Sequence, residues 1–136
     1  MTVLRHCLSM GVIGLLCAAP AAAQSEWVRV TSGTNNTVWL VRKTDAVNET
    51  NWKPSVWVKA DASKSSAVKW RTLMSFMRFD CSAQSHTTLQ DIQYSPAGET
   101  TYNRTYAPYE QSEIPTPPDT VIYAVAKKVC PSGAFP

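Results

Sequence analysis

The chain has 136 residues, a formal net charge of +3 and 17% charged residues. This length holds one ordinary domain and leaves no room for a separate catalytic domain. The longest runs of Lys and Arg are pairs, such as Arg42-Lys43 and Lys127-Lys128. A mildly basic chain without a basic stripe lacks what phosphate binding needs, so nucleic-acid binding is excluded as a function class.

The N-terminus has the pattern of an export signal. A single cation, Arg5, precedes the apolar run 7–19, and small residues follow up to Ala23. This order predicts a signal peptide over residues 1–23 that is removed by cleavage. The apolar run is shorter than the ~20 residues that cross a bilayer, so we expect no stable membrane insertion after cleavage. The expected mature domain, 24–136, would be exported to the periplasm, the cell surface or the medium.

Four cysteines are present, and two of them, Cys7 and Cys17, lie in the predicted signal. Cys81 and Cys130 remain in the exported domain. Two cysteines in an oxidising compartment allow one intramolecular disulfide. Their wide spacing excludes a CxxC-type redox or metal site.

The first predicted elements form a hairpin. Residues 27–31 alternate between apolar and polar positions, which predicts a half-buried strand. Residues 32–36 are a turn cluster, and 37–42 predict a second strand, antiparallel to the first. The polar stretch 43–53, closed by a proline, is expected to be a loop.

The middle of the chain predicts the centre of the sheet. Residues 55–59 alternate and predict a third strand, and the small polar residues 60–66 predict a loop. The stretch 70–81 carries apolar side chains at both alternating positions. Strands of this kind lie in the middle of a sheet, so we expect this one to be central.

A second hairpin and a helix follow. Residues 85–94 predict a strand with one wet face, 95–98 a turn and 99–106 the returning strand. Residues 121–130 carry the helical apolar spacing, and we expect Thr116 to cap this helix with the two following prolines in its first turn. The fold class is therefore α+β, a single small domain with a mostly antiparallel sheet of five or six strands, one C-terminal helix and one disulfide.

Six short segments in this order resemble the bacterial surface-adhesin protein E family. They are Trp27–Val30, Val56–Lys59, Phe79–Cys81, Tyr94–Gly98, Ile114–Pro115 and Val129–Cys130. The resemblance implies small exported proteins with an antiparallel sheet, one helix and a disulfide. It also implies adhesins that bind host matrix and serum proteins.

No catalytic signature is present. His86 is the only histidine of the expected mature domain, and it is expected to be a surface residue, with Asp91 five positions later and no Gly-x-Ser-x-Gly motif. Glu110 and Glu113 are interpreted as solvating charges of a proline-rich connector rather than as a carboxylate pair. We therefore predict no enzyme activity, no metal and no cofactor.

One cluster has the composition of a protein interface. Tyr102, Arg104 and Tyr106 fall on one side of the predicted strand, and Tyr109 follows closely. Tyr and Arg are enriched at protein interfaces, so these four are the predicted partner-binding residues. The alternative is that they only cover a half-exposed sheet face.

The sequence therefore predicts an exported, non-enzymatic binding protein of the adhesin type. Its expected partner is a protein, either a host matrix or serum protein or a component of the cell envelope, bound through a sheet face or an edge strand. The alternative is a periplasmic accessory or stress-related protein with no host ligand. Pairing of a free sheet edge with a second copy would give a homodimer, and nothing in the sequence fixes this.

Overall fold

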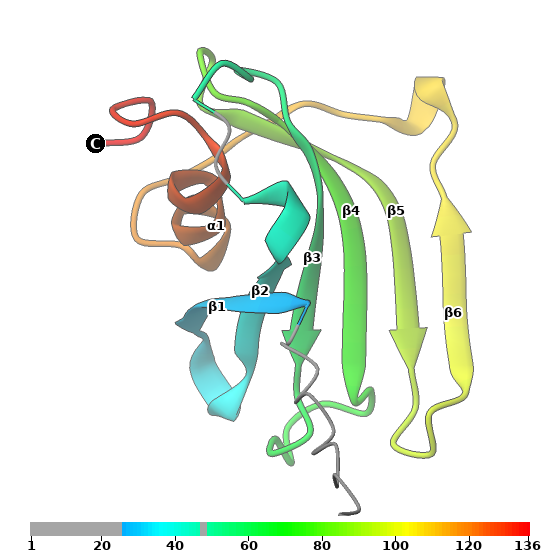
Figure 1. The fold of residues 1–136 in the computed structure, drawn as a ribbon. Coiled ribbons are helices and arrows are strands. Elements are labelled where there is room, and N and C mark those ends of the chain that lie inside the picture. Colours follow the sequence, from blue (N-terminus) through cyan, green and yellow to red (C-terminus); the bar gives the residue numbers. More distant parts are fainter. Residues whose placement is uncertain (1–25, 47–48) are drawn as a thin grey trace, which may run out of the picture.

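The computed structural model describes residues 26–46 and 49–136. The predicted signal peptide, residues 1–23, lies outside the described residues. The described chain folds as an antiparallel sheet with one helix on it (Figure 1).

The sheet follows the order of the sequence. Its strands lie in the order β1-β2-β3-β4-β5-β6, and each neighbouring pair is antiparallel. A seventh, two-residue strand pairs with β5. The strands are β1 Trp27–Ser32, β2 Val38–Arg42, β3 Ser55–Asp61, β4 Thr72–Asp80, β5 Ser85–Tyr94, β6 Thr100–Thr105 and β7 Ile114–Pro115. The predicted fold class is confirmed, and β7 is an addition that the sequence did not indicate.

Short 3-10 segments replace parts of the expected turns and loops. They are η1 Thr34–Asn36, η2 Lys43–Asp45 and η3 Pro108–Glu110. In η2 the Asp45 carboxylate accepts hydrogen bonds from the Arg42 guanidinium, at 3.2 Å, and from the backbone N–H of Trp57, at 2.9 Å. The start of the predicted loop 43–53 is therefore held against β3.

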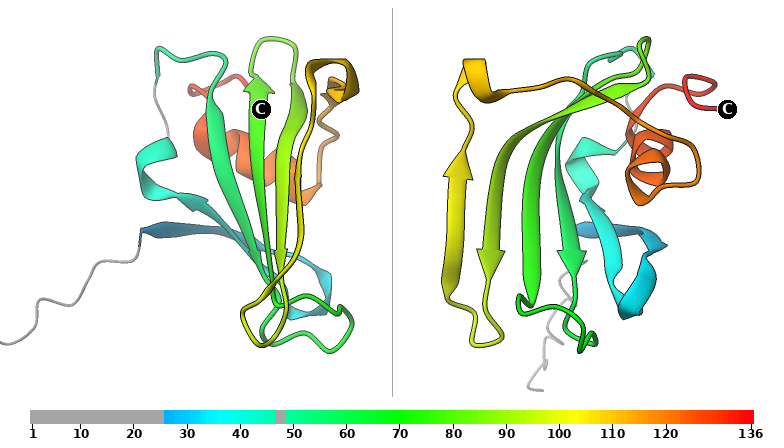
Figure 2. Two further views of the ribbon diagram at one scale, coloured as in Figure 1. Left: turned by 90° about the vertical axis from the view of Figure 1, so that its right-hand side faces the viewer. Right: turned by 180° about the vertical axis from the view of Figure 1, so that it is seen from behind.

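The helix α1, Val121–Val129, packs on one face of the sheet, away from the edge strand β6 (Figures 1 and 2). The contact is apolar because the two elements bring complementary faces together. The buried side chains at this contact are Val41, Val56, Val58, Met77 and Phe79 from the sheet, and Val125, Ala126 and Val129 from the helix. This layer is the core of the domain.

Strand β4 lies between β3 and β5, which confirms that the stretch 70–81 is central. Its two faces differ, however. Phe79 is completely buried on the face that the helix covers. Phe76, on the opposite face, is half-buried and packs on Trp57, with 5.1 Å between ring centroids. Aromatic pairs at such a centroid distance are stabilising beyond the area that they bury.

The predicted start of the helix is wrong. The helix begins at Val121, and its cap is Thr120, whose side chain accepts a hydrogen bond from the backbone N–H of Tyr123 at 3.1 Å. Asp119 has a left-handed backbone with φ of 59°, which a helix cannot continue through. The backbone N–H of Thr116 instead donates to the Gln84 carbonyl, so this segment is extended along the sheet.

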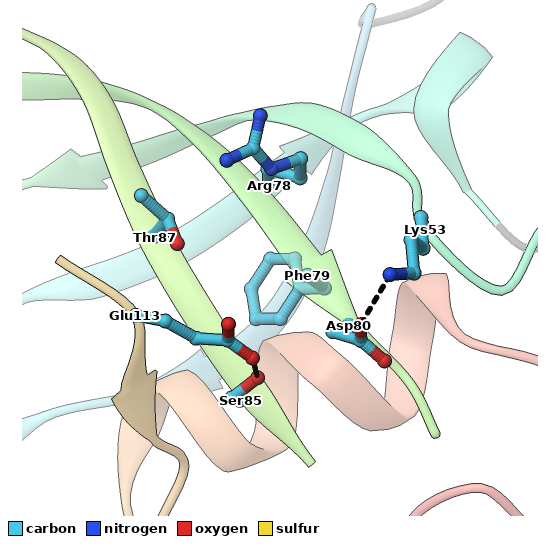
Figure 3. Close-up of a pocket in the computed structure, with 7 residues that line it drawn as sticks. All are labelled: Lys53, Arg78, Phe79, Asp80, Ser85, Thr87 and Glu113. Carbon is cyan, nitrogen blue, oxygen red and sulfur yellow. Dashed lines mark hydrogen bonds and ion pairs between the residues drawn. The ribbon is translucent and has the colours of Figure 1, made fainter. Parts of the chain in front are cut away.

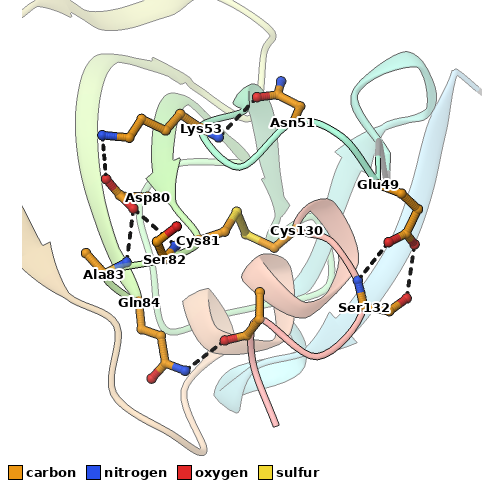
Figure 4. Close-up of a disulfide and its surroundings, with 11 residues drawn as sticks. Glu49, Asn51, Lys53, Asp80, Cys81, Ser82, Ala83, Gln84, Cys130 and Ser132 are labelled. Atoms are coloured by element: carbon orange, nitrogen blue, oxygen red, sulfur yellow. Dashed lines mark hydrogen bonds and ion pairs between the residues drawn. A yellow bond between two sulfur atoms is a disulfide. The ribbon is translucent and has the colours of Figure 1, made fainter.

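The predicted disulfide is confirmed. Cys81, directly after β4, is bonded to Cys130 at the end of α1, and both residues are buried (Figure 4). Further hydrogen bonds hold the chain after the helix. The Glu49 carboxylate accepts both the N–H and the hydroxyl of Ser132, and the Gln84 amide donates to the Ala134 carbonyl. The end of the central strand and the end of the helix are thus joined covalently and surrounded by hydrogen bonds.

Candidate functional site

A polar pocket of about 310 Å³ opens where β4 ends and β5 begins (Figure 3). We call it the β4–β5 pocket. Its lining comes from the segment before β3, from β4, from β5 and from the residue before β7. These residues are Lys53, Arg78, Phe79, Asp80, Ser85, Thr87 and Glu113.

Sheet register explains why these side chains meet. Arg78 lies opposite Thr87 and Asp80 lies opposite Ser85 in the β4–β5 ladder. Side chains directly opposite each other in an antiparallel pair share one face of the sheet. Because β7 pairs Ile114 with His86, the preceding residue Glu113 comes alongside Thr87.

An ion pair lies at one end of the pocket (Figure 3). The Lys53 ammonium lies 2.8 Å from the Asp80 carboxylate. This carboxylate also accepts the backbone N–H groups of Ser82 and Ala83, at 3.1 and 3.0 Å. The hydrogen bond from Lys53 and these backbone contacts lower the pKa of Asp80, and the same hydrogen bond raises the pKa of Lys53.

The rest of the pocket is lined by polar side chains that take no part in this ion pair. The Ser85 hydroxyl donates to the Glu113 carboxylate. Among the described residues no side-chain hydrogen bond or ion pair is found for Arg78, which is exposed. Thr87 is only 5% exposed, and its hydroxyl has no partner in the described part of the chain. Every fully buried side-chain N or O atom of the described residues has a hydrogen-bond partner. The unpartnered Thr87 hydroxyl oxygen is therefore not fully buried, and it is reached from the pocket that Thr87 lines.

The predicted partner-binding residues lie elsewhere, at the far edge of the sheet. Every residue of β6 is exposed, and no described strand pairs with its outer edge. Glu110 is the main cause that raises the pKa of Arg104, and the neighbouring Tyr102 raises the pKa values of both Arg104 and Tyr106. The Arg104 guanidinium lies 5.0 Å from the centre of the Tyr106 ring. These three side chains are therefore neighbours, and Arg104 lies against the Tyr106 ring.

Tyr109 extends this cluster from the segment η3. Its side chain is 89% exposed, and the next residue, Glu110, lies 2.6 Å from the Arg104 guanidinium. The Tyr106 hydroxyl donates to the Asp91 carboxylate at 3.0 Å, which anchors Tyr106 to β5. We call Tyr102, Arg104, Tyr106 and Tyr109 the tyrosine face.

Glu110 and Glu113 are more than the solvating charges that we expected. Glu110 accepts the backbone N–H of Ala107 at 2.9 Å, and this bond and the one from Arg104 lower its pKa. Glu113 lies in the β4–β5 pocket. The two carboxylates therefore serve different sites.

His86 is half-buried, and the expected surface position is wrong. Its ring lies 6.1 Å from the Phe79 ring, centroid to centroid, and its Nδ1 lies 2.9 Å from the Thr116 hydroxyl. Burial lowers the pKa of His86. Asp91 instead binds Tyr106 and the Ser75 hydroxyl, so the structure does not bring His86 and Asp91 together.

Within residues 26–46 and 49–136, no group of three His, Cys, Asp or Glu side chains gathers as metal ligands would. No helix in the same described ranges has the length and apolarity to cross a membrane.

The β4–β5 pocket was not found from the sequence. Its one usable signal is the charged pair Arg78 and Asp80, which occupies alternate positions at the end of an otherwise apolar strand. The apolar residues of that stretch indicate only the central strand. No local sequence pattern relates Lys53, Ser85 and Glu113 to this stretch, because they lie on other segments.

Comparison with known proteins gives one family. The model of the family described as surface-adhesin protein E matches residues 27–131. Neither the curated proteins nor the solved structures gave a match to this chain.

Proposed function

Since the chain belongs to the surface-adhesin protein E family, we propose that it is an exported, non-enzymatic protein that binds a protein partner through the tyrosine face. Family membership supports an adhesin-like protein with an exported or surface location. The kind of partner and the residues that bind it are what we propose beyond family membership. A matrix or serum protein, or a protein of the cell envelope, would be the partner.

The observation that carries this proposal is the exposure of the tyrosine face on an edge strand. Tyr102 and Tyr109 are 38% and 89% exposed. Tyr102 is a neighbour of the exposed Arg104 on β6, and Tyr109 directly precedes Glu110, the ion-pair partner of Arg104. Tyr and Arg are enriched among the interface residues whose truncation to Ala weakens binding most. Their exposure here leaves this apolar and hydrogen-bonding surface available for a partner.

Two side chains of the tyrosine face are held in place before binding. Arg104 is fixed by Glu110, and Tyr106 is fixed by Asp91. Groups that are already ordered lose less conformational entropy when a partner binds. The tyrosine face is therefore suited to specific recognition rather than to loose adsorption.

The test is a binding measurement with the mature domain against immobilised matrix and serum proteins and against cell-envelope extract. For the captured partner we expect the double variant Tyr102→Ala, Tyr109→Ala to lose at least about tenfold in affinity, which corresponds to about 1.4 kcal/mol. The free energy of unfolding should change only modestly, because Tyr109 is 89% exposed and Tyr102, 38% exposed, lies on the outer edge strand.

Trp52→Ala is the matched control, because Trp52 is an exposed aromatic, 45% accessible, outside the tyrosine face. It should bind the same partner as the unaltered domain does. Equal affinity of the double variant and the unaltered domain would rule out the tyrosine face as the binding surface.

A further inference from the structure

We propose that the β4–β5 pocket binds a small zwitterion of the α-amino acid class, with the carboxylate held by Arg78 and Thr87 and the ammonium by Glu113. This inference is independent of the tyrosine face and of the protein partner. It rests on which polar groups of the pocket already have partners and which do not.

The carboxylate end is defined by two donors. Arg78 carries a planar guanidinium, which binds carboxylates through two parallel hydrogen bonds. No side-chain partner occupies it in the described part of the chain. Thr87, directly opposite in the ladder, offers a hydroxyl that is reached from the pocket. A carboxylate between these two residues would receive bonds from both.

The ammonium end is defined by Glu113. Its carboxylate accepts one hydrogen bond from the Ser85 hydroxyl. A carboxylate has about four lone-pair sites, so acceptor capacity remains for a bound N–H group. Glu113 and Arg78 flank Thr87 from two sides but form no ion pair with each other within 4.0 Å. A ligand can therefore lie between them.

The remaining charges of the pocket are already compensated. Lys53 and Asp80 neutralise each other at 2.8 Å. Among the lining residues this leaves one cation, Arg78, and one anion, Glu113, for a ligand. A ligand with only a negative charge would be repelled by Glu113, and one with only a positive charge would be repelled by Arg78. A molecule with both charges satisfies each group.

The size of the pocket limits the ligand. Its volume of about 310 Å³ lies at the lower end of the range of roughly 300–1,000 Å³ for small-molecule sites. Apart from Phe79, the residues that line the pocket are polar or charged (Figure 3). A compact, charged molecule fits this description better than an extended apolar one.

The test is a titration of the full mature domain followed by NMR amide shifts. L-alanine is the probe, and acetate and ethylammonium, which carry only one of its two charges, are the matched controls. We expect saturable shifts at the end of β4 and the start of β5 with L-alanine, and at least tenfold weaker binding of either control. Absence of saturable shifts with every member of a panel of free α-amino acids would overturn the proposal, as would acetate binding as tightly as L-alanine.

Two variants test the assigned roles. Arg78→Gln and Glu113→Gln should each weaken L-alanine binding at least tenfold, and Gln at position 113 can still accept from Ser85, which preserves the local structure. Arg29→Gln, which removes an arginine of β1 that does not line the pocket, should leave binding within twofold. Unchanged affinity in Arg78→Gln or Glu113→Gln, with the dispersed amide spectrum of a folded domain, would contradict the assignment.

Discussion

The imidazole of His86 lies between an aromatic ring and a hydroxyl. Phe79 and Thr116 are its neighbours, and neither titrates near neutral pH. Burial disfavours the charged imidazolium and thereby lowers the pKa of His86 below its ordinary value of 6.5. The folded protein therefore binds fewer protons at this site than the unfolded chain does in mildly acidic solution.

We predict that His86 makes the domain less stable as the pH falls. Its contribution is fully present above pH 6.5, the ordinary value that applies to the unfolded chain. It is lost as the pH drops from there through the lowered folded pKa, because the unfolded chain takes up the proton first. Urea unfolding at a series of pH values between 5 and 7.5 should show this slope, and His86→Gln should lack it.

The carboxylates with lowered pKa values do not interfere with this measurement. Asp61 and Asp80 have ordinary values of 3.8 and Glu110 has one of 4.5, and their stabilising contributions are lost only below those values. The same slope in His86→Gln and in the unaltered domain would show that another group is responsible.

At the scale of elements, the start of α1 shows how local signals compete. Thr116 followed by two prolines has the pattern of a helix N-terminus, and Thr120 lies only four positions later. The sheet decides between them, because β7 binds β5 and keeps Thr116 extended beside Gln84 and His86. The left-handed Asp119 then turns the chain, and Thr120 becomes the cap.

We predict that Thr120→Ala destabilises the domain by about 1 kcal/mol, the usual cost of losing a helix cap. The reason is that the backbone N–H of Tyr123 loses its partner in the first turn. Chemical denaturation followed by circular dichroism measures the change. Thr120→Ser retains the hydroxyl and should stay within a few tenths of a kcal/mol of the unaltered domain, and an equal loss in both variants would argue against a capping role.

At the scale of the whole molecule, the disulfide closes a large loop. Cys81 and Cys130 are 49 residues apart in sequence and join the central strand to the helix. Such a bond limits the conformations of the unfolded chain, and in the chain-entropy model a loop of this length contributes about 4 kcal/mol. This is a large share of the roughly 5–15 kcal/mol by which a domain is stable.

We therefore predict that the double variant Cys81→Ser, Cys130→Ser loses about 4 kcal/mol of unfolding free energy. Urea unfolding of the oxidised domain and of the variant gives the difference directly. Reduction of the unaltered domain serves as the control, since it opens the same bond without changing the side-chain volume. A loss below about 1 kcal/mol in both would mean that the helix is held by its apolar face alone.

Much of the fold was predictable because its signals are local. Alternation of apolar residues placed β1 to β6 within one or two residues, and the continuous apolar stretch made β4 central. Two cysteines in the expected exported domain left only one intramolecular pairing. Strand parity likewise placed Tyr102, Arg104 and Tyr106 on one side, and in the structure Arg104 lies against the Tyr106 ring.

The β4–β5 pocket depended on tertiary structure. Its residues come from four separate segments, and an irregularity between Phe76 and Met77 shifts the register that places Arg78 opposite Thr87. A shift of one residue in pairing would send these side chains to the other face of the sheet. Sequence patterns fix which residues of one strand share a face, whereas the partner across the ladder is set by the packing of the whole sheet, and only the folded chain determines it.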